Sequence, residues 1–158
     1  MKTLLRTLPL LLALGGAPAC ASFHARTPDG FAALEDDERY DWRATNADGV
    51  VVSVRALRNR PYASLDFWAR AVDDRIQNGG YRRTDAHPVE TESGLRGQQF
   101  RYEASANGRT HHYWVTLFVV DRGPLRRNRV FLLEAGGDHE VFEQATPAVE
   151  RTIHAFRL

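Results

Sequence analysis

Hydrophobic and polar positions along the chain follow a strand-like pattern in six segments. These segments are Arg39–Thr45, Val50–Leu57, Tyr81–Thr91, Leu95–Ala104, Thr110–Val120 and Val130–Ala135. The turn sequences Asn46–Gly49 and Asn107-Gly108 predict hairpins between neighbouring strands. Residues 113–120 are almost continuously apolar, so we expect their strand in the centre of the sheet, covered on both faces. The segment 81–91 is polar and weakly alternating, which favours an edge strand or a sheet face near solvent.

Two further segments have the spacing of amphipathic helices. The first begins after Ser64, an N-cap residue, and ends at Gly79-Gly80. Its apolar residues recur at helical spacing: Leu65, Trp68, Ala69, Val72 and Ile76. For the second helix, we expect Gly136-Gly137 to break the chain and Asp138 to act as the cap. Pro147 is expected to restart or kink this helix.

Strands joined by hairpins, with separate helices, are typical of an α+β fold with a mostly antiparallel sheet. Each amphipathic helix must cover a sheet, and the central strand needs cover on both faces. We therefore predict a helix–sheet–helix sandwich around a central sheet of about six strands. The 158 residues, 43% hydrophobic and 26% charged, suit one folded domain rather than a disordered chain, and we place that domain at residues 28–158.

Residues 1–19 have the three parts of a secretory signal peptide. Lys2 and Arg6 make the start basic, an apolar run follows from Thr7, and small residues end the segment at Ala19. The 13 residues from Thr7 to Ala19 are fewer than the ~20 that a helix needs to span a bilayer. We therefore expect a cleaved signal and no spanning anchor.

The only cysteine, Cys20, directly follows this segment. Ala17-Pro18-Ala19-Cys20 resembles the lipobox of bacterial lipoproteins, in which the signal is cut before a cysteine that becomes lipidated. The sequence departs from that pattern at Ala17, where Leu is usual. Stable anchoring needs more than one acyl chain, and a triacylated cysteine supplies them. We expect residues 20–27 to form the lipidated cysteine and a short tether; an ordinary signal peptide, with Cys20 incidental, is the alternative.

The two residues after the cysteine bear on location. Ala21 and Ser22 lack the Asp that retains lipoproteins at the inner membrane in well-studied systems. By analogy, we expect a lipid-anchored protein of the bacterial cell envelope, at the outer membrane and facing the periplasm.

Charge and cysteine content exclude several classes of function. Removal of residues 1–19 takes away Lys2 and Arg6 but no acidic residue, so the formal charge changes from +1 to −1. A nucleic-acid binder needs a basic excess, which this chain lacks. A single cysteine allows no disulfide within the chain and no zinc site built from thiolates.

Several short motifs together resemble the PsbP-like fold. They are Pro28-Asp29-Gly30-Phe31, a Trp-bearing helix after the first hairpin, Gly79-Gly80-Tyr81, Gly97 in a following strand, and the closing Ala155-Phe156-Arg157. That fold includes the extrinsic photosystem protein, a Ran-binding nuclear-transport factor and small periplasmic lipoproteins of the DcrB type. The resemblance covers roughly residues 23–158 and implies an α/β/α sandwich with a binding or accessory role. It implies no catalytic residue.

Residue patterns for metal binding or catalysis are absent from the sequence. His111 and His112 are consecutive in a strand and point to opposite faces, and the other histidines are scattered without a metal-binding motif. No G-x-S-x-G motif occurs, and neighbouring carboxylates such as Glu90 and Glu92 are typical of a solvated face. We therefore expect no metal site, no cofactor and no enzyme activity.

Two groups of residues are candidates for contact with a partner. Four arginines fall within eight residues of a predicted loop and could meet an acidic partner or lipid phosphates, although a solvated loop also explains them: Arg122, Arg126, Arg127 and Arg129. Tyr40 and Trp42 share one face of their predicted strand and are the aromatics that we expect to be most exposed.

The leading hypothesis is a noncatalytic, membrane-tethered domain that binds a protein partner or supports an envelope complex. A lipid-tethered carrier of a small apolar ligand is the alternative, and an unrecognised hydrolase is a third. The first predicts a sandwich without a sizeable cavity. The second predicts an apolar cavity of several hundred Å³, and the third a cleft with pKa-perturbed groups.

The N-terminal assignment predicts a specific mature protein. Mass spectrometry of the membrane-purified protein should find acylated Cys20 as its first residue, and Cys20→Ser should abolish acylation. A soluble product that starts at Ala21 or Ser22 would contradict the assignment. Fractionation of the envelope should place the acylated form with the outer membrane.

Overall fold

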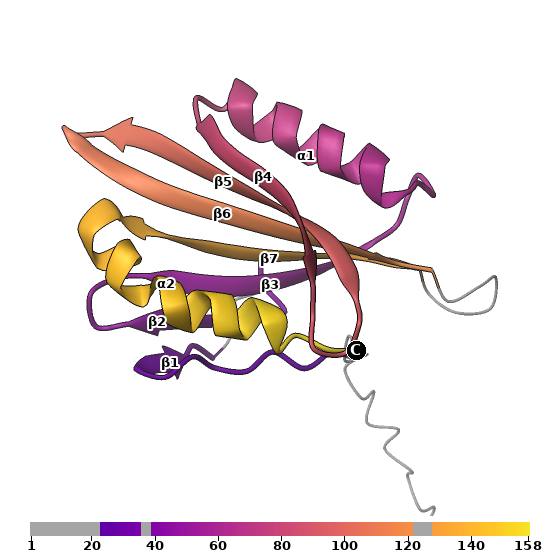
Figure 1. Cartoon of the computed structure of the whole chain (residues 1–158), viewed down its shortest axis with the longest axis horizontal. Helices are drawn as coiled ribbons and strands as arrows, with labels where there is room; N and C mark the ends of the chain where they lie inside the picture. The colour runs from indigo at the N-terminus through magenta and orange to yellow at the C-terminus, as the bar shows by residue number, and fades with distance from the viewer. Residues whose placement is uncertain (1–22, 36–38, 122–127) are drawn as a thin grey trace, which may run out of the picture.

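The structure is a computed structural model that describes residues 23–35, 39–121 and 128–158. It contains seven strands and two helices, which confirms the α+β class (Figure 1). In chain order they are β1 (Phe31–Ala33), β2 (Trp42–Asn46), β3 (Val51–Arg58), α1 (Leu65–Asn78), β4 (Arg82–Glu90), β5 (Arg96–Ala106), β6 (Arg109–Val120), β7 (Arg129–Asp138) and α2 (His139–His154). The expected six strands are one too few, because the three-residue β1 is too short to show an alternating pattern.

All strand pairs are antiparallel, and the sheet order is β1-β2-β3-β7-β6-β5-β4. After β3, the chain passes through α1 to the far edge of the sheet and returns through successive neighbours. The last of these strands, β7, thereby fills the place between β3 and β6. The predicted edge position of β4 is confirmed, and β6 lies in the interior, although β7 is the middle strand.

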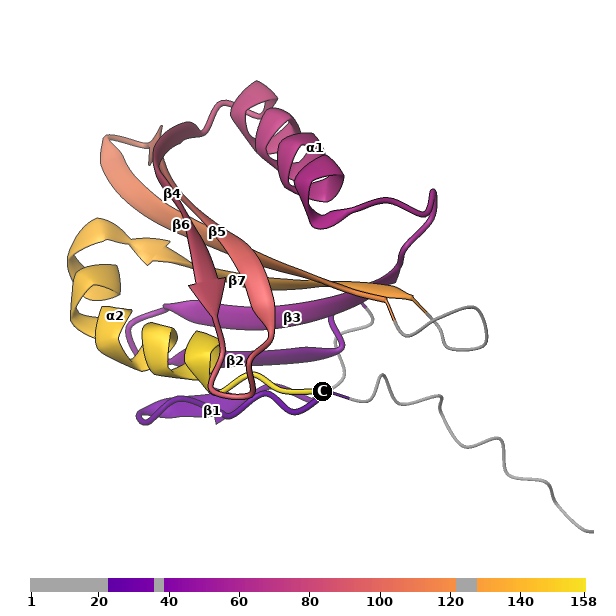
Figure 2. The same cartoon turned by 45° about the vertical axis from the view of Figure 1, so that its right-hand side comes forward.

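Side chains alternate between two hydrophobic clusters on opposite faces of the sheet. On β6, Trp114 and Phe118 belong to one cluster, and Val115 and Leu117 belong to the other. Helix α2 packs on the first face and α1 on the second (Figures 1 and 2). Neither helix is long and apolar enough to cross a membrane, within the part of the chain that the structure describes.

Helix α1 begins and ends where the sequence predicts. The hydroxyl of Ser64 accepts a hydrogen bond of 3.3 Å from the backbone N–H of Phe67. At the other end, the N–H of Gly79 donates to the carbonyl of Arg75, and Gly80 has a φ of +92°. Such a φ favours glycine, so this pair of glycines ends the helix.

The junction between β7 and α2 differs from the prediction. Gly136 and Gly137 do not break the chain but belong to β7, where Gly137 pairs with His112. A Cβ at Gly137 would lie 3.0 Å from Cγ2 of Val50, so the glycine permits close packing instead of a turn. Asp138 occupies the N-cap position of α2 without a side-chain capping bond.

Helix α2 continues through Pro147 as a single helix, so the proline neither restarts nor divides it. Its inward residues Phe142, Val149 and Ile153 are buried against the sheet. The hydroxyl of Thr146 donates a 3.1 Å hydrogen bond to the carbonyl of Phe142, one turn earlier.

The first described residues already belong to the folded domain. The ring of Phe23 packs at 5.9 Å from that of Phe131 and at 5.7 Å from that of Phe156. His24 and Arg157 form an isolated antiparallel bridge. The domain therefore starts before Pro28, and the second half of the predicted tether is packed on it. The predicted signal peptide and Cys20 lie outside the described residues.

Gly97 is a position at which a side chain should not be tolerated. It pairs with Phe118, and an added Cβ would lie 2.6 Å from the Phe118 ring and even closer to the Leu117 carbonyl. The Phe118 ring has little room to move, because it stacks on Phe156 at 5.5 Å. We expect Gly97→Ala to lower stability by about 2–3 kcal/mol, or roughly 5–10 °C in Tm.

The matched control is Gly136→Ala, because its Cβ would meet only ordinary or slightly tight contacts, the nearest at 3.3 Å. Thermal unfolding followed by circular dichroism measures both variants. An equal loss of Tm in the two would show that the close contact at Gly97 is not what matters.

Candidate functional site

A cleft of about 590 Å³ lies between α1 and the sheet. It forms because α1 packs over β5 and β6, while the parts of β3 and β7 on the same face have no helix above them (Figure 2). Its walls are predominantly apolar and come from α1, from β3, β6 and β7, and from the segment between α1 and β4: Leu57, Trp68, Val72, Ile76, Tyr81, Tyr113, Val115, Val130 and Leu132. The volume falls within the ~300–1,000 Å³ that small-molecule sites occupy.

A hydrogen-bonded ion pair lies among these apolar residues and forms a charged group in the cleft. Arg55 of β3 donates from Nε to Oε2 of Glu134 and from Nη2 to Oε1, each at 2.7 Å. The hydroxyl of Tyr113 on β6 also donates to Glu134 Oε1. The three residues meet because β3, β7 and β6 are adjacent and their side chains point to the α1 face.

The environment keeps this group in one protonation state. Burial raises the pKa of the Tyr113 hydroxyl well above its ordinary value, and the charge and hydrogen bond of Glu134 raise it further. For Arg55, burial lowers the pKa, but the hydrogen bond and charge of Glu134 outweigh it, so the pKa is raised. At neutral pH Tyr113 is therefore a donor and Arg55 a cation, and both oxygens of Glu134 are occupied.

A second buried carboxylate connects α1 to the covered half of the sheet. Asp73 accepts a 2.9 Å hydrogen bond from the hydroxyl of Tyr102 and forms an ion pair with Arg83. Burial raises the pKa of Tyr102, and its hydrogen bond to Asp73 adds to the effect. These contacts hold α1 over β5 and leave its other side facing the cleft.

The rim of the cleft carries an unpaired cation. Arg75 lines the cleft from the last turn of α1, and its side chain is exposed. Among the described residues, no side chain forms an ion pair with it. Leu57, near the end of β3 across the cleft, is 46% exposed. The cleft thus combines an apolar interior with a positive charge at its edge.

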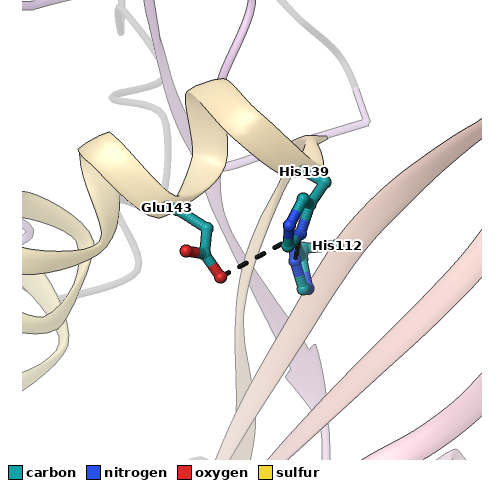
Figure 3. A group of neighbouring side chains, drawn as sticks. All are labelled: His112, His139 and Glu143. Atoms are coloured by element: carbon teal, nitrogen blue, oxygen red, sulfur yellow. Dashed lines mark hydrogen bonds and ion pairs between the residues drawn. The ribbon is translucent and has the colours of Figure 1, made fainter.

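A separate cluster of side chains lies on the α2 face (Figure 3). His112 comes from β6, His139 is the first residue of α2, and Glu143 lies one turn further along the helix. Nε2 of His112 is 2.5 Å from Nδ1 of His139, which is 4.0 Å from Oε1 of Glu143. Burial lowers the pKa of His112, and the neighbouring His139 lowers it further. These residues could together hold a metal ion.

The sequence predicts only part of this histidine arrangement. His111 and His112 do not converge, as predicted: His111 pairs with Asp138 at 2.6 Å, while His112 contacts His139. The remaining histidines are not all scattered, however. His112 pairs with Gly137 across β6 and β7, which brings His139 beside it. That register joins residues of two different strands, which no local pattern in the sequence reveals.

The predicted arginine contacts are described only in part. Arg122, Arg126 and Arg127 lie outside the described residues, so their role stays a prediction. Arg129 is not in a loop but is the half-buried first residue of β7, and its Nη1 donates a 3.2 Å hydrogen bond to the carbonyl of Ala56.

The prediction of exposed aromatics at Tyr40 and Trp42 is wrong. Both are half-buried: Trp42 packs on the α2-side cluster, whereas Arg55, from the other face, lies 5.7 Å from the Tyr40 ring. The two therefore lie on different faces of the sheet. The exposed aromatics are instead Tyr62 (66%) and Phe67 (43%), which flank the start of α1.

Comparison with known proteins shows the fold. No family model matches the chain, and none of the curated proteins matches it by sequence. A crystal structure of LpqN, involved in cell envelope biogenesis of Mycobacterium tuberculosis, matches with a TM-score of 0.71 and 14% identity, over 90% of this chain and 86% of LpqN. The Ran-binding protein Mog1p of Saccharomyces cerevisiae matches with a TM-score of 0.54 and 14% identity, over 86% of this chain and 89% of Mog1p. This chain therefore shares its fold with LpqN and Mog1p.

Proposed function

We propose that this chain is a noncatalytic lipoprotein of the bacterial cell envelope that binds an anionic amphiphile in the cleft beneath α1. The observation that carries the proposal is the apolar cleft of about 590 Å³ with Arg75 at its rim. A carrier of a small apolar ligand predicts such a cavity. A domain that only binds a protein partner predicts none, so the cleft favours the ligand-binding alternative over the leading hypothesis.

Two observations support the place of action. The N-terminal sequence resembles a lipoprotein signal that ends at Cys20. LpqN, which shares the fold, is involved in cell envelope biogenesis. We extend this to a lipid-anchored, periplasm-facing protein of the PsbP-like, DcrB type, at the outer membrane.

The chemistry of the cleft indicates the class of ligand. Valine, leucine, isoleucine and aromatic side chains offer dispersion contacts that suit an alkyl chain or a fused apolar ring. The guanidinium of Arg75 can bind a carboxylate or phosphate through paired N–H donors. A ligand with an apolar tail in the cleft and an anionic headgroup at the rim would satisfy both.

The charged group in the cleft is held in place by its own hydrogen bonds. Glu134 accepts two from Arg55 and one from Tyr113. The group therefore serves to fix three strands and to present a polar patch in the cleft.

A bulky side chain in the cleft should weaken ligand binding. Ala71 lines the cleft from α1 and is exposed, so Ala71→Phe fills part of the space without removing core packing. If the phenylalanine ring prevents burial of about two methylene groups of the ligand, at ~0.8 kcal/mol each, Kd should rise roughly tenfold. Isothermal titration calorimetry with dodecanoate measures this loss. The control is Gln77→Phe, an exposed position of the same helix that does not line the cleft.

Absence of dodecanoate binding to the unmodified chain, or an equal loss in both phenylalanine variants, would contradict a ligand site beneath α1. Circular dichroism establishes that the variants remain folded.

The headgroup contact predicts a charge-dependent effect of Arg75. We expect Arg75→Ala to weaken dodecanoate binding roughly two- to fivefold, as expected for an ion pair exposed to solvent, and to leave dodecanol binding unchanged. Arg70→Ala is the matched control, because Arg70 is an exposed arginine of the same helix outside the cleft. An equal effect of Arg75→Ala on the acid and the alcohol would exclude Arg75 as the headgroup contact.

A further inference from the structure

The geometry points to a binding site for a divalent late transition metal, Zn²⁺ being the reference ion, formed by His112, His139 and Glu143. This inference is independent of the ligand proposed for the cleft. His112 and Tyr113 are consecutive in β6 and point to opposite faces, so the two sites lie on different sides of the sheet.

The donor set is one that such ions prefer. Two imidazole nitrogens and one carboxylate oxygen are ordinary ligands of zinc, and imidazole also suits copper and nickel. The three ligand atoms lie within 4.8 Å of one another, and Glu143 points toward the two histidine rings (Figure 3). Three protein ligands leave a fourth position for water or another molecule.

The distances require only small side-chain movements. Two nitrogens at ~2.0–2.1 Å from a tetrahedral zinc ion are roughly 3.3 Å apart. The nitrogens of His112 and His139 are 2.5 Å apart, so the ion would take the place of a shared proton and the rings would separate slightly. The Glu143 oxygen, 4.0 Å from Nδ1 of His139, would move closer.

Two of the three side chains in the cluster are free to move toward an ion, and the third is held in place. The side chains of His139 and Glu143 are 49% and 65% exposed, so they can adjust their rotamers. His112 is more constrained, because its ring lies 5.5 Å from that of Phe142 and is held on a paired strand. One fixed ligand and two adjustable ones can close around an ion.

The surrounding charges favour a cation. Glu103, which also forms an ion pair with Arg82, lies opposite His112 across β5 and β6 and adds negative potential there. Asp138 is already engaged by Arg109 and His111, so it does not add a fourth ligand. Without a cation, the histidine pair is held by a single hydrogen bond, and this is the alternative that the experiment must separate from a metal site.

Calorimetric titration of the purified full-length chain with ZnCl₂ tests the inference. We expect one Zn²⁺ per chain, and His112→Ala or His139→Ala should each weaken binding at least tenfold. Glu143→Gln should weaken it less. His87→Ala is the matched control, since His87 also pairs with a carboxylate, that of Asp85, but lies on β4, outside the cluster; it should leave Kd and stoichiometry unchanged.

A second readout keeps the result independent of folding. Co²⁺ substituted at the same site should give the visible d–d bands of a four-coordinate ion in the unmodified chain and in His87→Ala, and none in His139→Ala. Because His139 is exposed, that variant should retain its circular dichroism spectrum. No stoichiometric zinc binding, or equal binding by His139→Ala, would reduce the cluster to a hydrogen-bonded histidine pair.

Discussion

A seven-stranded sheet with a single helix on each face cannot be covered completely by those helices. Strands lie 4.7–4.9 Å apart, so seven of them extend over roughly 29 Å, whereas a helix with its side chains is about 10–12 Å wide. On the α2 face, residues outside the helix cover part of the remaining sheet, since Phe23, Phe31 and Phe156 also pack there. On the α1 face, the described residues leave part of β3 and β7 uncovered, and that part becomes the floor of the cleft.

The composition of that floor reflects its partial exposure. A buried ion pair is seldom more stable than apolar residues of the same volume, because desolvation offsets the attraction. Arg55 and Glu134 nevertheless occupy adjacent strands in the middle of the sheet. Tyr113 completes the pairing of Glu134, so neither Arg55 nor Glu134 is left without a hydrogen-bond partner. A polar group fixed in this way gives an apolar cleft a defined orientation for a bound molecule.

Local signals in the sequence predict most of the elements but not their lateral arrangement. The hairpin at Asn46–Gly49 and helix α1, from Ser64 to Gly79, depend on residues close in sequence, and both occur as predicted. Gly136 and Gly137 fail as a break, because their role is close packing between strands, which no local pattern reveals.

The candidate sites were harder to predict for the same reason. The cleft depends on where α1 lies on the sheet, and the histidine cluster depends on the register that pairs His112 with Gly137. Both are long-range properties. The resemblance to a sandwich with a Ran-binding member anticipated the overall architecture, and the similarity to Mog1p agrees with it.

The bridge between His24 and Arg157 brings together the two ends of the part of the chain that the structure describes. The N–H of His24 donates to the Arg157 carbonyl at 2.8 Å, and the N–H of Arg157 donates to the His24 carbonyl at 3.3 Å. A short peptide could join these extremities, and new ones could be opened at the exposed tip Ala47–Gly49, to give a circularly permuted chain with the same seven-stranded architecture.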